Sequence, residues 1–230
     1  MKRLSAKKSP FFSTKRFFSI LSILLFLVSF SACKKNIDYF DYVSECRSNI
    51  FIAETDEYRL RIYAVTKEIP YVTDGIPKEL STRTEVFFIA PSGDKDCSLY
   101  FTVNGKEYGG ELSYDNVKAE YYYSCTLDTS ACRELSCRIQ YSDTEMQLRA
   151  ASVLKDSTLS AKSVLYSIVE NERELFTSLT DKYGFTGEIY LRLIYEDAPY
   201  YYLGVIDRNG NVYAFLINAE TGKILAKRQS

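Results

Sequence analysis

The sequence predicts a mostly β protein, with an antiparallel β-sandwich followed by a small α+β domain. Three observations support this fold class. Short apolar runs alternate with turn residues from Cys46 to about Val153, and no helical period lies between them. Apolar residues then recur at helical spacing from Ala161. The last part alternates with period two around short turns, which is typical of an antiparallel meander.

The N-terminal segment, residues 1–32, has the features of a secretory signal peptide. Residues 1–16 carry six basic side chains and no acid, and a mostly apolar run follows over 17–30. This run is shorter than the roughly 20 residues that a membrane-spanning helix needs. We therefore expect residues 36–230 to lie outside the cytoplasm, whether the signal is cleaved or is kept as an anchor helix.

The end of this segment, Phe30-Ser31-Ala32-Cys33, resembles the lipobox of bacterial membrane lipoproteins. In that family the cysteine is acylated and becomes the new N-terminus. Ser31 and Ala32 match the family pattern, whereas Phe30 stands where Leu is usual. The resemblance implies that lipidated Cys33 anchors the protein to the cell membrane, on its extracellular or periplasmic side. Residues 33–45 would then form a short tether.

Composition argues against several function classes. The chain has no histidine, so it cannot form a Ser-His-Asp or Cys-His catalytic arrangement, and it lacks the commonest zinc ligand. After residue 32 it holds 23 Lys and Arg against 30 Asp and Glu, because residues 1–32 contain six of the 29 basic residues. This mild acidity argues against nucleic acid as a partner. No motif for a cofactor is present, so we expect a protein without cofactor or metal.

Residues 46–153 are predicted to form the β-sandwich, which we expect to be immunoglobulin-like in general shape. In one run Leu60, Ile62 and Ala64 alternate with Arg59, Arg61 and Tyr63, as in a half-buried strand. Asn104-Gly105 predicts a two-residue hairpin. A long segment, 67–82, is either a binding loop or a simple connection. The expected strands cover 49–54, 58–65, 85–90, 97–103, 106–108, 118–127, 137–142 and 146–153.

Five cysteines follow Cys33, and disulfides are permitted outside the cytoplasm. An odd number leaves at least one free thiol. Cys125 and Cys137 lie on strand-like runs joined by one loop, so they form our candidate disulfide. A zinc site is disfavoured, since these cysteines have no Cys-x-x-Cys spacing. The alternative is that all five are reduced and buried: Cys46, Cys97, Cys125, Cys132 and Cys137.

A polar linker, residues 154–160, separates the sandwich from the α+β domain, residues 161–230. Apolar residues at helical spacing predict one amphipathic helix of about six turns over 161–183, with Ser160 as its N-cap. Asn209-Gly210 predicts a second tight hairpin within the meander that follows. We expect the helix to cover one face of the meander. The expected strands are 188–195, 200–206, 211–217 and 223–226.

The run from Val205 to Leu225, with its Asn218-Ala-Glu-Thr-Gly222 turn, resembles the end of a PepSY-type module. That family combines a helix with a small antiparallel sheet and ends in a turn of this kind. Asn218 stands where the family more often has Asp. The resemblance covers about residues 160–228. It implies a protein-interaction or protease-modulating module of the cell envelope, and it carries over no catalytic residue.

Two tyrosine triplets supply the candidate binding residues, because exposed aromatic side chains are enriched at interfaces. Alternate residues of a strand face opposite sides, so each triplet places at least one ring outward. The candidates are Tyr121, Tyr123, Tyr200 and Tyr202. The alternative is that these rings cover the edges of a thin core.

These observations predict a non-catalytic surface lipoprotein that binds another envelope or extracellular protein. Two other functions stay open. One is an envelope enzyme or enzyme subunit that acts on cell-wall material through carboxylates. The other is a purely structural assembly component. The acidic clusters of the sequence lie in turns or on the expected helix face, where solvated surface charge is the simpler interpretation.

Overall fold

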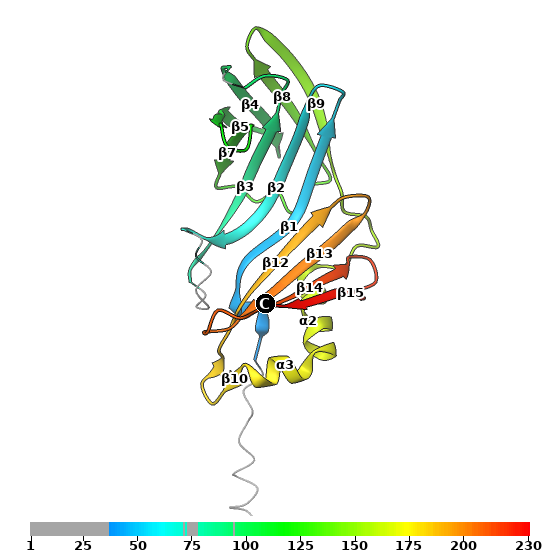
Figure 1. Ribbon diagram of the computed structural model, residues 1–230. Coiled ribbons are helices and arrows are strands. Elements are labelled where there is room, and N and C mark those ends of the chain that lie inside the picture. Colours follow the sequence, from blue (N-terminus) through cyan, green and yellow to red (C-terminus); the bar gives the residue numbers. More distant parts are fainter. Residues whose placement is uncertain (1–36, 71, 73–77, 94) are drawn as a thin grey trace, which may run out of the picture. The chain divides into compact units, whose positions relative to one another are not determined.

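The structure is a computed structural model that describes residues 37–70, 72, 78–93 and 95–230 (Figure 1). The signal segment and Cys33 lie outside the described residues. Within the described ranges, no helix is both long and apolar enough to cross a bilayer. The residues from Asp38 to Ser230 belong to one compact unit.

The fold is mostly β, as predicted, and nearly all strands belong to one large, mainly antiparallel sheet. Its first half contains β1 (Val43–Glu54), β2 (Arg59–Glu68), β3 (Leu80–Ile89), β4 (Cys97–Val103), β5 (Lys106–Glu111), β6 (Ser113–Asp115), β7 (Glu120–Cys125), β8 (Glu134–Tyr141) and β9 (Thr144–Ser152). The other elements are η1 (Tyr39–Tyr42), α2 (Ala161–Asn171), α3 (Arg173–Ser178), β10 (Thr180–Asp181), β11 (Gly184–Phe185), β12 (Glu188–Tyr195), β13 (Pro199–Ile206), β14 (Val212–Asn218) and β15 (Ile224–Gln229).

Strand β1 is shared by the two halves of the fold, because different strands occupy its second edge (Figure 1). One edge pairs with β2 along most of its length. On the other edge, Val43 to Arg47 pair in parallel with β12, whereas Phe51 and Ile52 pair with β9. The β1–β2 register shifts between Arg47 and Asn49. A bulge of this kind bends a strand, and here it marks the point where the sheet divides.

The first core lies among β1 to β9. Alternation in β2 and β3 places Leu60, Ile62, Val86 and Phe88 in this core, fully buried. For β2, this is the face that the sequence predicts. The hairpin at Asn104-Gly105 is also confirmed. Val103 pairs with Lys106, and both turn residues have positive φ.

The second core lies between α2 and the meander (Figure 1). The helix contributes Val164, Leu165 and Ile168, all fully buried, and Ser160 caps its start by accepting from the Ser163 N–H. β12 contributes Ile189, Leu191 and Leu193, while β13 contributes Tyr201, Leu203 and Val205. The expected packing of a helix on one face of the meander is therefore present.

The helical segment differs from the single six-turn helix that the spacing predicts. It breaks at Glu172, whose φ of −112° and ψ of 40° are not helical, and it ends at Ser178. The Asp181 carboxylate accepts hydrogen bonds from the N–H groups of Tyr183 and Gly184, at 2.7 and 3.2 Å. This bonding favours a turn over a helix. Tyr183, the last residue of the predicted helix, is 84% exposed.

The segment predicted as a tether, residues 33–45, already contains regular structure. Helix η1 begins at Tyr39, and β1 begins at Val43. Asp38 accepts from the Phe40 N–H, from the Tyr166 hydroxyl and from Lys162. These contacts lower the pKa of Asp38 to about 2 and raise that of Tyr166 to about 12. The chain is therefore held against α2 from Asp38 onward.

The second Asn-Gly pair does not form the two-residue hairpin that we predicted. Ile206 pairs with Val212, so five residues connect β13 to β14. The Asp207 carboxylate organises this loop by accepting from the N–H groups of Asn209 and Asn211, at 2.8 and 2.9 Å. A hydrogen bond from the Asn211 side-chain amide at 2.7 Å, together with these backbone bonds, lowers the pKa of Asp207. A side chain that satisfies the loop backbone replaces the tight turn.

Candidate functional site

A cleft of about 400 Å³ opens where the sheet divides at β1. We call it the fork cleft. Its walls come from β1, from the loop before β8, from the connection between β9 and α2, and from β13. Sequence reasoning treated that connection, residues 154–160, as a linker only. The lining residues are Ser48, Ser130, Ala131, Cys132, Arg133, Leu154, Lys155, Asp156, Thr158, Leu159, Ser160, Ala161 and Tyr201.

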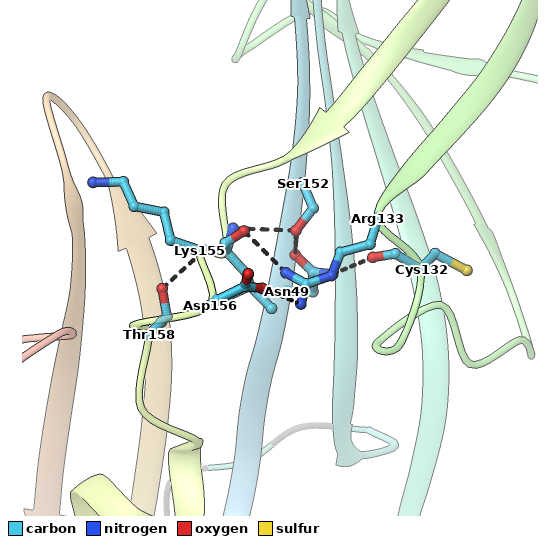
Figure 2. A network of polar contacts seen from close by, with 8 residues as sticks. Asn49, Cys132, Arg133, Ser152, Lys155, Asp156 and Thr158 are labelled. Atoms are coloured by element: carbon cyan, nitrogen blue, oxygen red, sulfur yellow. Dashed lines mark hydrogen bonds and ion pairs between the residues drawn. The ribbon is translucent and has the colours of Figure 1, made fainter.

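A buried amide beside the bulge holds the walls of the fork cleft together (Figure 2). Asn49 is fully buried, and its Nδ2 donates to the carbonyl oxygens of Ser130 and Cys132, both at 3.1 Å. Its Oδ1 accepts from the Ser152 hydroxyl at 2.7 Å. The Ser152 oxygen in turn accepts from the Leu154 N–H at 3.1 Å. One side chain of β1 thus fixes both loops that form the cleft.

The rim of the fork cleft is charged and exposed (Figure 2). Arg133 donates to the Leu154 carbonyl at 3.3 Å and pairs with Asp156 at 2.9 Å. Lys155 pairs with Glu220 at 2.8 Å. The Asp156 side chain is 97% exposed, so the Arg133–Asp156 pair contributes little to stability. These charges can therefore rearrange around a ligand at small energetic cost.

The reactive groups of the fork cleft are held in their protonated forms. Burial, together with Asp128, raises the pKa of the Cys132 thiol. A protonated thiol is a poor nucleophile, and the chain has no histidine to deprotonate it. Burial likewise raises the pKa of Tyr201, whose hydroxyl donates to the Leu159 carbonyl at 3.0 Å. Neither group is therefore an activated nucleophile.

A second surface lies on the outer face of β1, β2, β3 and β7, and we call it the cation–aromatic row. It consists of Arg47, Tyr63, Phe87 and Tyr122. The Arg47 guanidinium carbon lies 4.1 Å from the centre of the Tyr63 ring. The ring centroids of Tyr63 and Phe87 are 5.2 Å apart, as are those of Phe87 and Tyr122. Such side-by-side packing across strands stabilises a sheet and orders the rings.

Charged side chains flank the cation–aromatic row, and ion pairs and hydrogen bonds tie several of them together. Glu85 is nearly buried, and it accepts from Lys67 at 2.6 Å and from the Tyr122 hydroxyl at 3.3 Å. Glu45, also nearly buried, accepts from the Nε of Arg192 at 2.8 Å. Such pairing offsets part of the cost of burying a carboxylate. Ordered ion pairs and hydrogen bonds therefore surround the row.

The structure places the first tyrosine triplet with the opposite faces from those we predicted. Tyr121 is 1% exposed, and its hydroxyl both accepts from the Lys95 N–H and donates to the Lys95 carbonyl. The Tyr123 hydroxyl donates to the Gly109 carbonyl at 3.0 Å. Tyr121 belongs to the first core, and Tyr123 is partly buried and packs against it. The exposed member is Tyr122, at 37%.

In the second triplet, the middle tyrosine faces the opposite side from the two candidate binding residues. Tyr201 is buried, and its hydroxyl donates to the Leu159 carbonyl, whereas Tyr200 and Tyr202 are half-buried on the other face of β13. Tyr202 pairs with Arg192, and Arg192 pairs with Arg47 across the β12–β1 boundary. Register partners point to the same side of a sheet, so these tyrosines share a face with the cation–aromatic row. Sequence reasoning missed the row itself, although the alternation in β2 placed Tyr63 on the outer side.

All five cysteines that follow Cys33 are free thiols in the structure. The candidate Cys125–Cys137 disulfide is not formed: both residues are free thiols, on strands that do not pair with each other. β7 pairs with β3 and β6, whereas β8 pairs with β4 and β9. Burial raises the pKa values of Cys46, Cys97 and Cys137 to about 12.

Comparison of the chain with protein-family models, curated proteins and solved structures found no match. The PepSY-type resemblance of the C-terminal part therefore stays a prediction. Lipidation of Cys33 stays a prediction as well.

Proposed function

We propose that the chain is a non-catalytic lipoprotein that binds another envelope or extracellular protein. Cys33 would hold it on the outer side of the cell membrane. Residues 46–153 would serve as an immunoglobulin-like sandwich domain, and residues 161–230 as a PepSY-like α+β domain. The partner would bind the outer face of the sheet that carries the cation–aromatic row, Tyr200 and Tyr202.

The observation that supports this proposal is the cation–aromatic row. Tyrosine and arginine dominate the binding energy of protein interfaces, because large flat groups bury much area with few rotatable bonds. In the row, each ring is already fixed by its neighbour at 5.2 Å. Fixed rings lose little conformational entropy when a partner covers them. The row therefore has the composition and the order of a preformed binding surface.

The test is recovery of the partner from intact cells after chemical cross-linking, with a tagged full chain as bait. Tyr122→Ser should reduce the recovered partner about tenfold, as expected for an interface hot spot. Tyr183→Ser is the matched control, because Tyr183 is an exposed tyrosine on the β10–β11 hairpin. Recovery should not change in this control.

Tyr200 and Tyr202 should be replaced without Tyr201, whose buried hydroxyl helps to hold the second core together. Thermal unfolding of each purified variant shows whether it is folded. Equal recovery from folded Tyr122→Ser, folded Tyr200→Ser/Tyr202→Ser and the parent chain would refute the proposed surface.

A further inference from the structure

A pocket of about 100 Å³ lies beside the Arg47 end of the cation–aromatic row, between β1, β2 and the end of β12. Its apolar lining comes from three isoleucines, of which Ile50 is the most buried. Two guanidinium groups and two tyrosine rings complete it, and one carboxylate, that of exposed Glu196, also lines it. The lining residues are Arg47, Ile50, Ile52, Arg61, Tyr63, Ile194, Tyr195 and Glu196.

Arg47 places a positive charge at this pocket. No neighbouring acidic side chain in the described part of the chain forms a direct ion pair with it. The two carboxylates that interact with the Arg47 charge are those of Glu45 and Glu85. Glu45 is bonded to Arg192, and Glu85 to Lys67. Among the described residues, no carboxylate lies within ion-pair distance of Arg47, whose Nη1 makes one long bond of 3.5 Å to the Leu193 carbonyl.

The buried Nε atoms of Arg47 and Arg61 have no hydrogen-bond partner among the described residues. Arg61 approaches Glu54 only at 3.9 Å, and Glu54 is bonded more closely to Arg59, at 3.1 Å. Burial also lowers the pKa of Arg47, which shows that its charge is poorly solvated. An anion in the pocket would relieve this cost.

We propose that the pocket binds a carboxylate group of the protein partner, from an acidic side chain or from the C-terminus. This inference rests on the proposed function and adds the chemistry that the partner must present. A volume of 100 Å³ has room for about three water molecules, well below the 300 Å³ or more of a typical small-molecule site. The pocket is therefore large enough for one small functional group and not for a whole small-molecule ligand. Guanidinium groups match the planar geometry of a carboxylate, and the isoleucines would contact the methylene groups that carry it.

The experiment follows the Arg Nε–H signals of the full chain in detergent by NMR, with ¹⁵N-labelled arginine. The probes are N-acetylglutamate amide for a side-chain carboxylate and N-acetylglycine for a terminal one. N-acetylglutamine amide is the neutral match, and inorganic phosphate is the competing anion. The carboxylate probes should shift the signals of Arg47 and Arg61. The glutamine probe should shift neither.

Variants assign the binding to this pocket. Arg47→Gln and Arg61→Gln should each weaken binding of the carboxylate probe tenfold or more. Arg59→Gln is the matched control, since Arg59 lies on the same strand and is paired with Glu54, and it should have no effect. If Arg47→Gln does not fold, Arg47→Lys keeps the charge but loses the planar group, and it should weaken binding severalfold.

Several results would overturn the inference. These are no shift with either carboxylate probe, equal binding of the glutamine probe, tighter binding of phosphate, or an equal effect of Arg59→Gln. The proposed function fails separately, when Tyr122→Ser leaves partner recovery unchanged. A partner that depends on Tyr122, with no carboxylate binding at Arg47, would keep the interface and reject the pocket.

Discussion

Asn49 illustrates how a single buried amide can determine a local architecture. It follows the bulge in β1, and its hydrogen bonds reach the loop before β8 and the end of β9. A buried polar group is tolerated only when its bonds are made, and here donor and acceptor are both used. The fork cleft therefore exists because this amide satisfies backbone groups that the divided sheet leaves without strand partners.

The Asn49→Ala substitution should lower the free energy of unfolding by about 2–4 kcal/mol, because it leaves the Ser130 and Cys132 carbonyls without this donor. Urea denaturation measures the change. Asn171→Ala is the matched control, since its amide bonds lie at the exposed end of α2, and it should cost less than about 1 kcal/mol. Equal effects of the two substitutions would show that the Asn49 network is not a stabilising feature.

The buried thiols should make the folded state less stable at alkaline pH. An unfolded cysteine loses its proton near its ordinary pKa of 9.0, whereas Cys46, Cys97 and Cys137 keep theirs to about 12. Above pH 9 the native state therefore binds more protons than the unfolded state, and its stability falls as pH rises. Each thiol contributes a slope of up to about 1.4 kcal/mol per pH unit.

Urea denaturation in the presence of a reductant, from about pH 8 to pH 10, tests this dependence. Replacing Cys97 and Cys137 together by Ala removes two of the three thiols and should flatten the fall. An unchanged slope in that variant would show that other groups cause the pH dependence.

At the scale of elements, the meander depends on a close contact between two neighbouring strands. The Tyr190 ring of β12 lies directly over Gly204 of β13, and a Cβ added at Gly204 would be 1.9 Å from its Cζ. Gly204→Ala should therefore lower the free energy of unfolding by about 1–3 kcal/mol. In a Tyr190→Ala background the same substitution should cost almost nothing. A penalty that persists without the ring would contradict this contact as the cause.

The sequence predicted those features of the fold that are set by a few neighbouring residues, such as strand alternation, helix caps and tight turns. Alternation in β2, the capping Ser160 and the Asn104-Gly105 turn all appear in the structure as expected. In the first tyrosine triplet, Tyr122 and not the candidate Tyr121 is exposed, because three identical residues in a row give no alternation from which the outer face could be read. The helix end was missed because the bonds of Asp181 to the following backbone outweigh the apolar spacing.

Contacts between distant segments could not be predicted. The parallel pairing of β1 with β12 joins Val43 to Ile189, and no local signal in the sequence marks it. The cation–aromatic row depends on the same kind of information, since its four residues come from four strands. The free thiols are another case, because the distance and orientation of two cysteines on different strands are set by the tertiary fold and not by their local sequence.

For the whole molecule, the shared strand β1 has a consequence for cooperativity. It pairs with β2 and β9 of one half and with β12 of the other, so neither half keeps its sheet without it. Residues 38–230 should therefore unfold in one transition, although the sequence predicts two domains. Hydrogen exchange measured along a urea series reports residues 46–153 and 161–230 separately. Coincident midpoints are expected, and clearly separate midpoints would show independent domains.

The proposed function requires that a partner protein contacts the outer sheet face at the cation–aromatic row. Site-specific photo-cross-linking in intact cells tests it most directly, with a photoreactive phenylalanine at Tyr122 and, as the control, at Tyr183. Tyr122 is 37% exposed within the row, and Tyr183 is 84% exposed outside it. A discrete cross-linked species from position 122, and none from position 183, is the expected result. The absence of a cross-link at 122, or the same species from both positions, would contradict the claim.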